Sequence, residues 1–525
     1  MISLKHLSKT TSVCPECLKI IAAEIFEKDG KVWIKKKCEE HGAFEDLYYG
    51  SYEMYKKAEK FAKDGRGVEN PAITKDNPLC PFDCGLCKLH KSHTALANIA
   101  ITNRCDLSCW YCFFYAGKMG YIYEPTLDDI KKMVKTLRDE KPVPCNALQL
   151  TGGEPTLRDD LVEIIKIAKD ADIDHVQLNT NGIKMSKDLD LVKRVREAGV
   201  NTMYYSFDGV SAKTNPKNHW ETPEFLKNCR EAGVGVVFVP TVIKGSNDSE
   251  LGDILRFGFK NIDVVRGVNF QPVSLVGMMP RKERDKHRIT IPDTIQKIEE
   301  QTDGEISKDD FYPIPIISAF TRFVEAITNK PRYNLTSHFA CGMATYVFND
   351  NGKMLPITRF VDVEGLMEYL NERADELEGG MSKYVTGAKL LFKLKGFVDA
   401  KKSPDGMSFP KIIYNALIKH DYRSLGEMHY KSLFVGMMHF MDLYNYDIER
   451  VKRCCIHYAM PDGKIVPFCT FNVMPEMYRD KAQKEHSMTI EEWEKKVGKS
   501  MKTDMYKRDA KFLENTDLYK KTYSK

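Results

Sequence analysis

The stretch that decides the fold is CDLSCWYC, residues 105–112, which lies just after the apolar run LANIAIT. Its three cysteines, Cys105, Cys109 and Cys112, can each bind one iron of a four-iron four-sulfur (4Fe–4S) cluster and leave the fourth iron without a protein ligand. Such an iron is open to a small molecule. The spacing alone leaves two other interpretations, an electron-transfer cluster whose fourth ligand lies elsewhere and a zinc knuckle.

A second motif, TGGEPTLRDDL at residues 151–161, follows the apolar run ALQL and precedes a helical pattern. Gly152 and Gly153 allow the backbone to approach a ligand closely, and the carboxylate of Glu154 can hold an ammonium group. Alone, the string also fits an ordinary strand-to-helix turn. Its place downstream of the cysteine triplet favours a joint ligand site.

Together the triplet, with Tyr111 before its third cysteine, and the GGEP string resemble the radical S-adenosylmethionine (radical SAM) superfamily. The resemblance implies that the catalytic cluster at the triplet chelates SAM and that its reduction starts radical chemistry. It also implies that Tyr111 lies at the cofactor. The residues that would receive the methionine amino group are Gly152, Gly153, Glu154 and Pro155.

The region around these motifs alternates strand and helix patterns about every thirty residues. Strands are predicted at 95–102, 147–150, 174–180, 201–207, 234–243 and 264–272. The alternation predicts a parallel sheet with outer helices, and the resemblance implies a partial (βα)6 barrel of the TIM type.

Ligands of such barrels bind at the carboxyl ends of the strands. The polar residues predicted there as cofactor-binding are Asn179, Asn181, Ser206, Asp208, Asn269 and Gln271. By resemblance, the first four would contact the ribose or the methionyl carboxylate of SAM. Polar capping of the barrel mouth is the alternative.

Near the N-terminus, CPEC and CEEH form two knuckles whose four candidate metal ligands are Cys14, Cys17, Cys38 and His41. Three thiolates and one imidazole suit tetrahedral zinc or a rubredoxin-like single iron, and the sequence does not choose between them. Because four ligands close the shell, we expect a structural site.

The string CPFDCGLCKLH repeats the triplet spacing with Cys80, Cys84 and Cys87. Leu86 replaces the aromatic residue and no strand is predicted before the string, so we predict an auxiliary iron–sulfur cluster here. Besides a non-protein group, the candidates for its fourth ligand are His90, Cys145 and Cys341. Taken alone, Cys145 and Cys229 fit buried thiols better.

A third group of metal-ligand candidates comprises Cys341, Cys454, Cys455 and Cys469. The strings around Cys341 and Cys455 both predict a cysteine, a strand, an Asn-Gly or Asp-Gly turn and a second strand. They resemble the SPASM and twitch auxiliary-cluster domains, which implies a C-terminal α+β domain with a second auxiliary cluster. The first string departs from that pattern, because Ile357 and Thr358 follow Pro356 where a cysteine would stand.

The chain has 525 residues and a net charge of only +5, which argues against a general affinity for nucleic acid. Its fifteen cysteines cluster at ligand spacings, which indicates metals rather than disulfides. No signal peptide or long apolar run is visible, so we expect a cytoplasmic protein, with peripheral contact at the inner membrane face as an option.

Four units are predicted: a metal domain at 1–75, an auxiliary-cluster segment at 76–97, the barrel at 98–275, and an auxiliary-cluster and lipid-binding domain at 276–525. In the last unit, helical stretches rich in Met and aromatics, such as 383–397 and 428–444, fit core or an apolar lipid channel. The basic tail from residue 507 is expected to be a solvated helix and fray.

The order of these motifs over nearly the whole chain resembles the archaeal tetraether lipid synthases (the glycerol dibiphytanyl glycerol tetraether or macrocyclic archaeol synthase family). The resemblance implies carbon–carbon bond formation between the terminal methyl carbons of phytanyl chains, with two SAM per bond. The implied partners are an archaeal diether phospholipid and an external ferredoxin-like electron donor. The implied cofactors are SAM, three 4Fe–4S clusters and one mononuclear iron or zinc.

Two rival enzyme interpretations are a radical SAM methyltransferase acting on a pterin-like ring and a SPASM-type peptide maturase, since both use extra clusters. A rival of another class is an iron–sulfur electron carrier. The GGEP string and the NTNG loop at 179–182 argue against that last interpretation.

Overall fold

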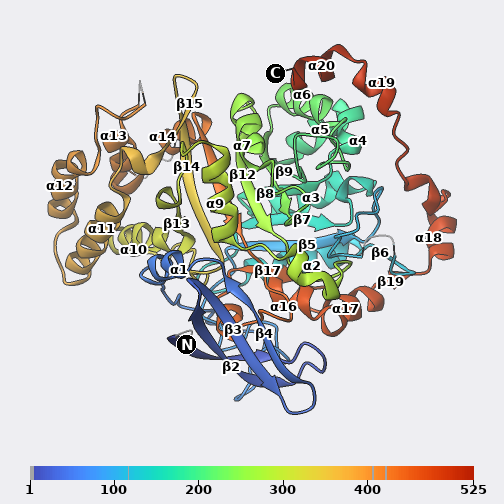
Figure 1. The fold of residues 1–525 in the computed structure, drawn as a ribbon, viewed down its shortest axis with the longest axis horizontal. Helices are drawn as coiled ribbons and strands as arrows, with labels where there is room; N and C mark the ends of the chain where they lie inside the picture. The colour runs from blue at the N-terminus through green and yellow to red at the C-terminus, as the bar shows by residue number, and fades with distance from the viewer. Residues whose placement is uncertain (1–4, 116–117, 405–406, 420–422, 525) are drawn as a thin grey trace.

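Six parallel strands form the barrel in the computed structural model, which describes residues 5–115, 118–404, 407–419 and 423–524 (Figure 1). In sheet order they are β5 (Leu96–Thr102), β7 (Ala147–Gly152), β8 (His175–Thr180), β9 (Val200–Tyr205), β10 (Gly235–Phe238) and β12 (Val265–Pro272). The predicted partial (βα)6 barrel is therefore confirmed. One predicted strand, 234–243, is split into β10 and β11 (Thr241–Val242), because Pro240 between them has no N–H to donate to the sheet.

Helices follow the strands and pack against the outside of the barrel. They are α2 (Leu127–Arg138), α3 (Leu161–Asp170), α5 (Leu189–Ala198), α6 (Thr222–Ala232), α7 (Leu251–Lys260) and α9 (Ile291–Gln301). In α2, a capping box of Thr126 and Asp129 begins the helix, and Ile130, Val134 and Leu137 are buried on one face. This spacing of apolar residues is what directs a helix onto a sheet.

Strands from the C-terminal half extend the same sheet at both edges (Figure 1). Beyond β12 lie β16 (Ser432–Met438), β14 (Gly342–Asp350), β15 (Lys353–Pro356) and β13 (Tyr312–Pro313); beyond β5 lie β17 (Ile456–Ala459) and β18 (Ile465–Pro467). Both predicted hairpins, β14–β15 and β17–β18, are present and antiparallel. The unit boundaries at 75, 97 and 275 stay a prediction.

The N-terminal segment forms a separate four-stranded antiparallel sheet of β1 (Lys5–Val13), β2 (Ile20–Lys28), β3 (Lys31–Cys38) and β4 (Gly42–Tyr49), followed by α1 (Tyr52–Glu59). We call β1–β4 the ribbon. Buried charges join it to the rest of the protein: Arg288 Nε lies 3.1 Å from Asp46 of β4, and Arg288 Nη1 lies 2.5 Å from Asp442. The ribbon is thus tied to the C-terminal half by an ionic network.

A lobe beside the barrel contains α10 (Ser318–Thr328), α11 (Val363–Glu378), α12 (Lys383–Lys393), α13 (Phe409–Tyr414) and α14 (Arg423–Tyr430), shown in yellow to orange in Figure 1. Leu370, Leu390, Leu394 and Phe409 are buried in one hydrophobic cluster. The stretch 383–397 therefore contributes to a core rather than to a channel. The other Met-rich stretch, predicted helical, holds strand β16, because its residues pair with β12 on one side and with β14 on the other.

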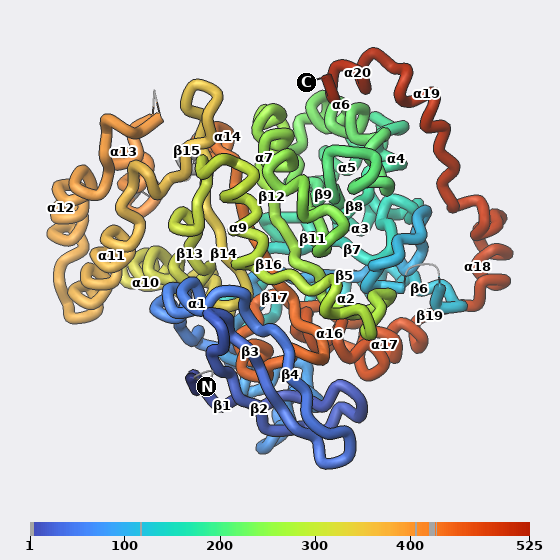
Figure 2. The backbone as a smooth tube through the Cα atoms, viewed as in Figure 1, coloured from blue at the N-terminus to red at the C-terminus, as the bar shows by residue number. Residues whose placement is uncertain are grey.

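The C-terminal tail runs along the outside of the barrel, in red in Figure 2, through α18 (Ile490–Val497), α19 (Ala510–Glu514) and α20 (Asp517–Tyr523). The Tyr523 ring stacks on His219, with ring centroids 4.3 Å apart. The expected solvated helix is confirmed by α19 and α20, which are mostly exposed, but the expected fraying is wrong, since aromatic residues of the tail find partners on the barrel. In the part of the chain that the structure describes, every helix is too short or too polar to span a bilayer.

Candidate functional site

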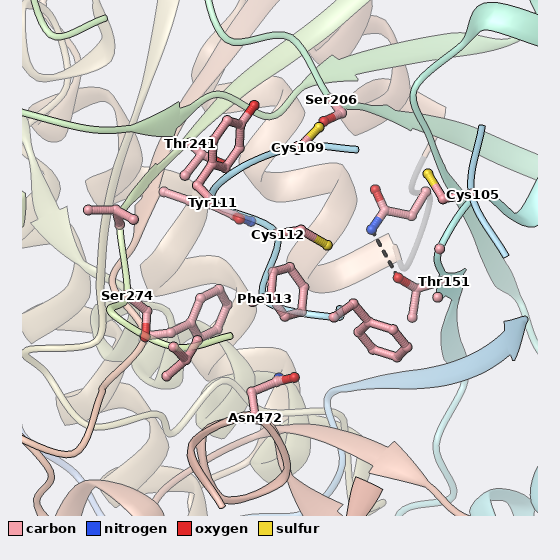
Figure 3. A pocket seen from close by; sticks show the side chains of 18 of the residues that line it. Cys105, Cys109, Tyr111, Cys112, Phe113, Thr151, Ser206, Thr241, Ser274 and Asn472 are labelled. Atoms are coloured by element: carbon pink, nitrogen blue, oxygen red, sulfur yellow. Dashed lines mark hydrogen bonds between the residues drawn. The ribbon is translucent and has the colours of Figure 1, made fainter. Parts of the chain in front are cut away.

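A cavity of about 1150 Å³, part of it open to solvent, lies at the carboxyl ends of the barrel strands (Figure 3). The predicted site residues that line it are Cys105, Cys109, Tyr111, Cys112, Gly152, Gly153, Glu154, Asn179, Asn181, Ser206, Gln271 and Cys469. The structure thus gathers most of the predicted cofactor site around one space.

The loop that holds Cys105 is fixed by the residue before it. Arg104 Nε donates to Glu124 at 2.8 Å, its Nη1 lies 2.5 Å from Asp504, and its Nη2 donates to the Leu157 carbonyl at 2.8 Å. The guanidinium also lies 4.4 Å from the centre of the Trp493 ring. Arg104 therefore ties the start of the cysteine loop to the barrel and to the C-terminal tail.

The two glycines of the GGEP turn let β7 dock on this loop. A Cβ on Gly152 would lie 2.1 Å from the Thr102 carbonyl oxygen, and one on Gly153 would lie 2.0 Å from that of Arg104. Their close approach is therefore to the backbone of the cysteine loop. The Gly153 and Glu154 N–H groups donate to the same two carbonyls, at 2.8 and 2.7 Å.

Glu154 presents a buried carboxylate to the cavity. One oxygen accepts from the hydroxyls of Thr156 and Thr180, at 2.6 and 2.8 Å, and the other accepts from the Asn181 N–H at 2.8 Å. Burial and the nearby Asp106 carboxylate raise its pKa to about 7. No basic side chain of the described residues lies within 4.0 Å of it. This uncompensated acceptor fits a cationic ligand such as the ammonium group of SAM.

Beside the cysteines, Tyr111 belongs to a small polar network. Its hydroxyl donates to Asp208, and Lys217 Nζ lies 2.6 Å from the same carboxylate. Lys217 also donates to Ser206 and lines the cavity. Sequence reasoning missed Lys217, because it lies in the irregular loop between β9 and α6 and only its position after a barrel strand hints at a role.

Three predicted cofactor-binding residues do not line the cavity. Asp208 is covered by Tyr111 and Lys217, and its other oxygen accepts the Thr241 N–H at 2.9 Å. Asn269 donates to the Tyr204 hydroxyl. Pro155 is buried as the first residue of a short 3-10 turn, Pro155–Leu157. These three support the residues of the lining.

The C-terminal half supplies cavity residues that carry no recognisable motif. Phe440, Phe468 and Asn472 line the space, the last two from α16 (Phe468–Val473). The rings of Phe440 and Phe468 stack with centroids 3.9 Å apart. Only Cys469, between Phe468 and Asn472, gave a signal in the sequence.

Cys469 also lines a second, smaller cavity with the rest of its predicted group, Cys341, Cys454 and Cys455. Arg450 is 1% exposed there, and its Nε donates to the Cys341 sulfur at 3.4 Å. His439 lines the same space with neither ring nitrogen hydrogen-bonded among the described residues. The four thiols thus surround a buried space next to the main cavity.

The loop of Cys80, Cys84 and Cys87 packs nearby. The Tyr478 hydroxyl accepts from the Cys84 N–H at 3.3 Å and donates to the Phe82 carbonyl at 2.8 Å. Two protein candidates for the fourth ligand have other partners: the Cys145 thiol donates to Ala147 at 3.3 Å, and Cys341 belongs to the third group. His90 Nε2 lies 2.8 Å from the Cys454 carbonyl, which leaves Nδ1 for a metal. His90 and a non-protein group remain the predictions for the fourth ligand.

In the ribbon, the ligand atoms of Cys14, Cys17, Cys38 and His41 all lie within 4.8 Å of one another. The Cys38 sulfur is 3.5 Å from His41 Nδ1 and 3.9 Å from the Cys17 sulfur. Two knuckles, one between β1 and β2 and one between β3 and β4, bring them together. This geometry fits a single tetrahedral metal ion.

Two family models match the chain: the radical SAM superfamily over residues 99–258 and the HMPTM N-terminal zinc ribbon domain over residues 6–50. The 7,8-dihydro-6-hydroxymethylpterin dimethyltransferase of Methanocaldococcus jannaschii is 47% identical over 503 residues, covering 93% of this chain and 98% of that protein. The chain belongs to this dimethyltransferase family. As a radical SAM enzyme it uses SAM and a 4Fe–4S cluster, and its N-terminal zinc ribbon has a metal site.

Two further proteins match only part of this chain. The GTP 3',8-cyclase of Aquifex aeolicus is 30% identical over 231 residues, covering 41% of this chain and 66% of the cyclase. Among solved structures, a radical SAM methyltransferase from Sphaerobacter thermophilus is 12% identical with a TM-score of 0.30, covering 57% of this chain and 75% of that one.

Family membership corrects the substrate expected from motif order. The tetraether lipid synthase resemblance is wrong, because the relative that matches nearly the whole chain is named for methyl transfer to a pterin. The two expectations that follow from that resemblance, the joining of phytanyl chains and a diether phospholipid partner, are therefore wrong as well. The motifs behind that expectation serve radical chemistry shared across a superfamily, and a fold or cofactor motif does not specify a substrate.

Proposed function

We propose that this protein is a radical SAM methyltransferase whose substrate is a pterin such as 7,8-dihydro-6-hydroxymethylpterin. The observation that supports this most is the 47% identity with a dimethyltransferase of that pterin, across 93% of this chain and 98% of the relative. A radical SAM methyltransferase acting on a pterin-like ring is one of the two rival enzyme interpretations of the sequence.

The cavity has the surfaces that a pterin requires. A pterin is flat and carries ring nitrogens and a carbonyl, so it is recognised by stacking and by amide groups. The stacked pair Phe440 and Phe468 offers an aromatic wall, and the amides of Gln271 and Asn472 line the same space. Few polar groups on a largely apolar wall are typical of a small-molecule site.

The residues of the chain divide the work of the reaction. Cys105, Cys109 and Cys112 would hold the cluster, and Glu154 would receive the SAM ammonium. When bound, one SAM and the reduced cluster would supply hydrogen-atom abstraction from the pterin carbon, and a second SAM would supply the methyl group that replaces this hydrogen, with two electrons from the external reductant per methyl group. Tyr111, Phe440 and Phe468 cover the space beside the cysteines and keep water away from a reactive centre.

We infer two auxiliary 4Fe–4S clusters in addition, one at Cys80, Cys84 and Cys87 and one at Cys341, Cys454, Cys455 and Cys469. Arg450 supports the second site. It is a buried cation, and no carboxylate of the described residues lies within 4.0 Å of it. A buried charge is costly unless it is compensated, and a thiolate-ligated cluster would supply the negative charge. At the ribbon we propose a single zinc ion.

The decisive experiment incubates anaerobically reconstituted protein with dithionite, SAM and 7,8-dihydro-6-hydroxymethylpterin, and follows the pterin by mass spectrometry. We expect products with one and two added methyl groups, and labelled SAM identifies the source of the methyl carbon. The Cys105→Ala, Cys109→Ala, Cys112→Ala triple variant is the control and should give none. Formation of 5'-deoxyadenosine without any methylated pterin, or with consumption of an added lipid instead, would overturn the substrate assignment.

Metal analysis tests the auxiliary clusters separately. Iron content and Mössbauer spectra of the reconstituted protein should show three 4Fe–4S clusters. Replacing Cys454 and Cys469 with Ala should remove one of them and leave the other two. A spectrum that is unchanged by this double substitution would contradict the second auxiliary site.

A further inference from the structure

Trp110 is a large aromatic residue left at the surface of the cysteine loop. It stands between Cys109 and Tyr111, it is 46% exposed, and it does not line the main cavity. Its ring meets the ring of Tyr111 edge-on, with centroids 5.5 Å apart. Exposed tryptophans are over-represented among the residues that anchor protein partners. This one is also covalently adjacent to a cluster ligand.

Basic residues lie on the chain segments next to this tryptophan. Its ring centroid lies 5.5 Å from that of His287, at the end of the basic segment RKERDKH, residues 281–287. The Lys244 N–H donates to the His287 carbonyl at 3.4 Å. Lys118, on the same loop as Trp110, lines a small cleft with Cys105, Cys109 and Cys112. The exposed cations of these segments are Lys118, Lys244, Arg281, Lys282 and Lys286.

Acidic residues do not cancel this charge. The surface holds Glu283 and Asp285, and Glu283 is already bonded to Lys286 and His287, each at 3.3 Å. With Lys286 paired to Glu283, four exposed cations, Lys118, Lys244, Arg281 and Lys282, stand against Asp285 on these segments, which leaves them positively charged. A positive rim around an aromatic anchor complements an acidic protein.

We propose that Trp110 and these cations, which we call the Trp110 face, are the docking surface for an acidic one-electron carrier protein that reduces the cluster at Cys105, Cys109 and Cys112. In this step the carrier loses one electron and the cluster gains it, and no bond forms or breaks. Docking here brings the carrier to the residue next to a cluster ligand. The cavity stays free for SAM and substrate, because Trp110 does not line it.

The rival entry point is the loop of Cys80, Cys84 and Cys87, where Leu79 and Leu89 are exposed by 55% and 37%. There the charges compensate each other locally: Lys75 pairs with Asp83, Lys88 with Asp76 and Lys464 with Asp462. A face whose charges are paired in this way gives an acidic carrier little electrostatic attraction. The Trp110 face is therefore the better match.

The test measures cluster reduction directly. Reconstituted protein with SAM is mixed with an acidic 4Fe–4S ferredoxin that has been reduced beforehand, and samples are frozen at set times. The cluster at Cys105, Cys109 and Cys112 is followed by the part of the electron paramagnetic resonance signal that SAM shifts, which separates it from the other clusters. The Lys282→Glu, Lys286→Glu variant should lower the second-order rate about tenfold at low salt, and the difference should shrink at high salt as charges are screened. Trp110→Ala should lower the rate at both salt concentrations.

Two controls make the result specific. Lys495→Glu, Lys496→Glu reverses two charges on α18 and should leave the rate unchanged. Dithionite should reduce the parent and every variant equally. Unchanged ferredoxin rates in the Lys282, Lys286 variant, or a loss found in Leu79→Glu instead, would overturn the proposal.

This inference rests on the cluster site of the proposed function, and the two fail differently. If dithionite reduces the cluster but ferredoxin reduces the parent and the charge-reversal variant equally, the docking surface is wrong and the cluster site stands. If dithionite reduces no cluster bound at Cys105, Cys109 and Cys112 in the parent, the cluster site fails and the docking surface with it.

Discussion

The ribbon and the cysteine loop of the barrel each present cysteines to a metal, but they are built in opposite ways. In the ribbon, four ligand atoms lie within 4.8 Å of one another and strands hold both knuckles. In the barrel, three cysteines lie on an irregular loop and face an open cavity beside the uncompensated Glu154 carboxylate. A closed set of ligands stabilises a fold, whereas an incomplete set with a neighbouring charge leaves a place for a reactant.

Removing the three cysteines of the barrel loop should have the largest effect on activity. In the Cys105→Ala, Cys109→Ala, Cys112→Ala variant we expect 5'-deoxyadenosine formation to fall below about one thousandth of the parent rate, since the uncatalysed reaction is slower by many orders of magnitude. The metal of the ribbon should remain. If this variant still cleaves SAM while Cys80→Ala, Cys84→Ala, Cys87→Ala does not, the two triplets have been assigned in the wrong order.

Removing metal ligands of the ribbon should instead destabilise the ribbon itself. Cys17→Ser, Cys38→Ser should lower the free energy of unfolding of the ribbon by about 5 kcal/mol or more, because metal binding is a large part of the stability of such small domains. Hydrogen exchange of β1–β4 measures this loss of protection. SAM cleavage at 25 °C should persist. If it is lost together with the ribbon metal, the ribbon site is not purely structural and the contrast with the barrel site is wrong.

The charge of Glu154 should matter most for ligand binding. Glu154→Gln keeps the shape but weakens a charge-assisted hydrogen bond, so we expect SAM affinity to fall about thirtyfold, or about 2 kcal/mol. The matched control is Glu140→Gln, because Glu140 is also buried, accepts the Thr94 N–H at 2.6 Å and lies outside the cavity. Calorimetric titration with SAM should separate them, and equal losses in both would contradict the ammonium assignment.

The smallest effect is expected from Glu140, and it concerns how the free energy of unfolding depends on pH. Burial raises its pKa to about 7, above its value of about 4.3 in an unfolded chain. The folded state therefore binds the extra proton, and stability rises as the pH falls through 7. Between pH 8 and pH 6 this amounts to about 1.3 kcal/mol. Denaturant unfolding at pH 8 and pH 6 measures this change in the free energy of unfolding. The parent should be stabilised by about 1.3 kcal/mol more than Glu140→Gln on going from pH 8 to pH 6, and equal changes in both proteins would contradict the raised pKa.

Short sequence patterns predicted the parts of the fold and site that neighbouring residues in the chain determine. The barrel strands follow from apolar runs, and the positions of Cys105 and Glu154 follow from motifs. Lys217 was missed because an irregular loop places it, and tertiary packing has no local sequence signal. Phe440 was missed for a related reason: β16 before it has a Met-rich sequence that also fits a helix, and only its pairing with β12 and β14 decides for a strand.

The bond between Arg104 and Asp504 joins residues 400 positions apart, and it has a consequence for how the protein is made. During synthesis Arg104 and Cys105 leave the ribosome long before Asp504 and Trp493, at a rate of about 5–20 residues per second. The barrel strands can pair in that interval, but the cysteine loop lacks its last anchor. Iron–sulfur assembly on the finished chain therefore meets a fixed loop, whereas assembly during translation meets a loose one.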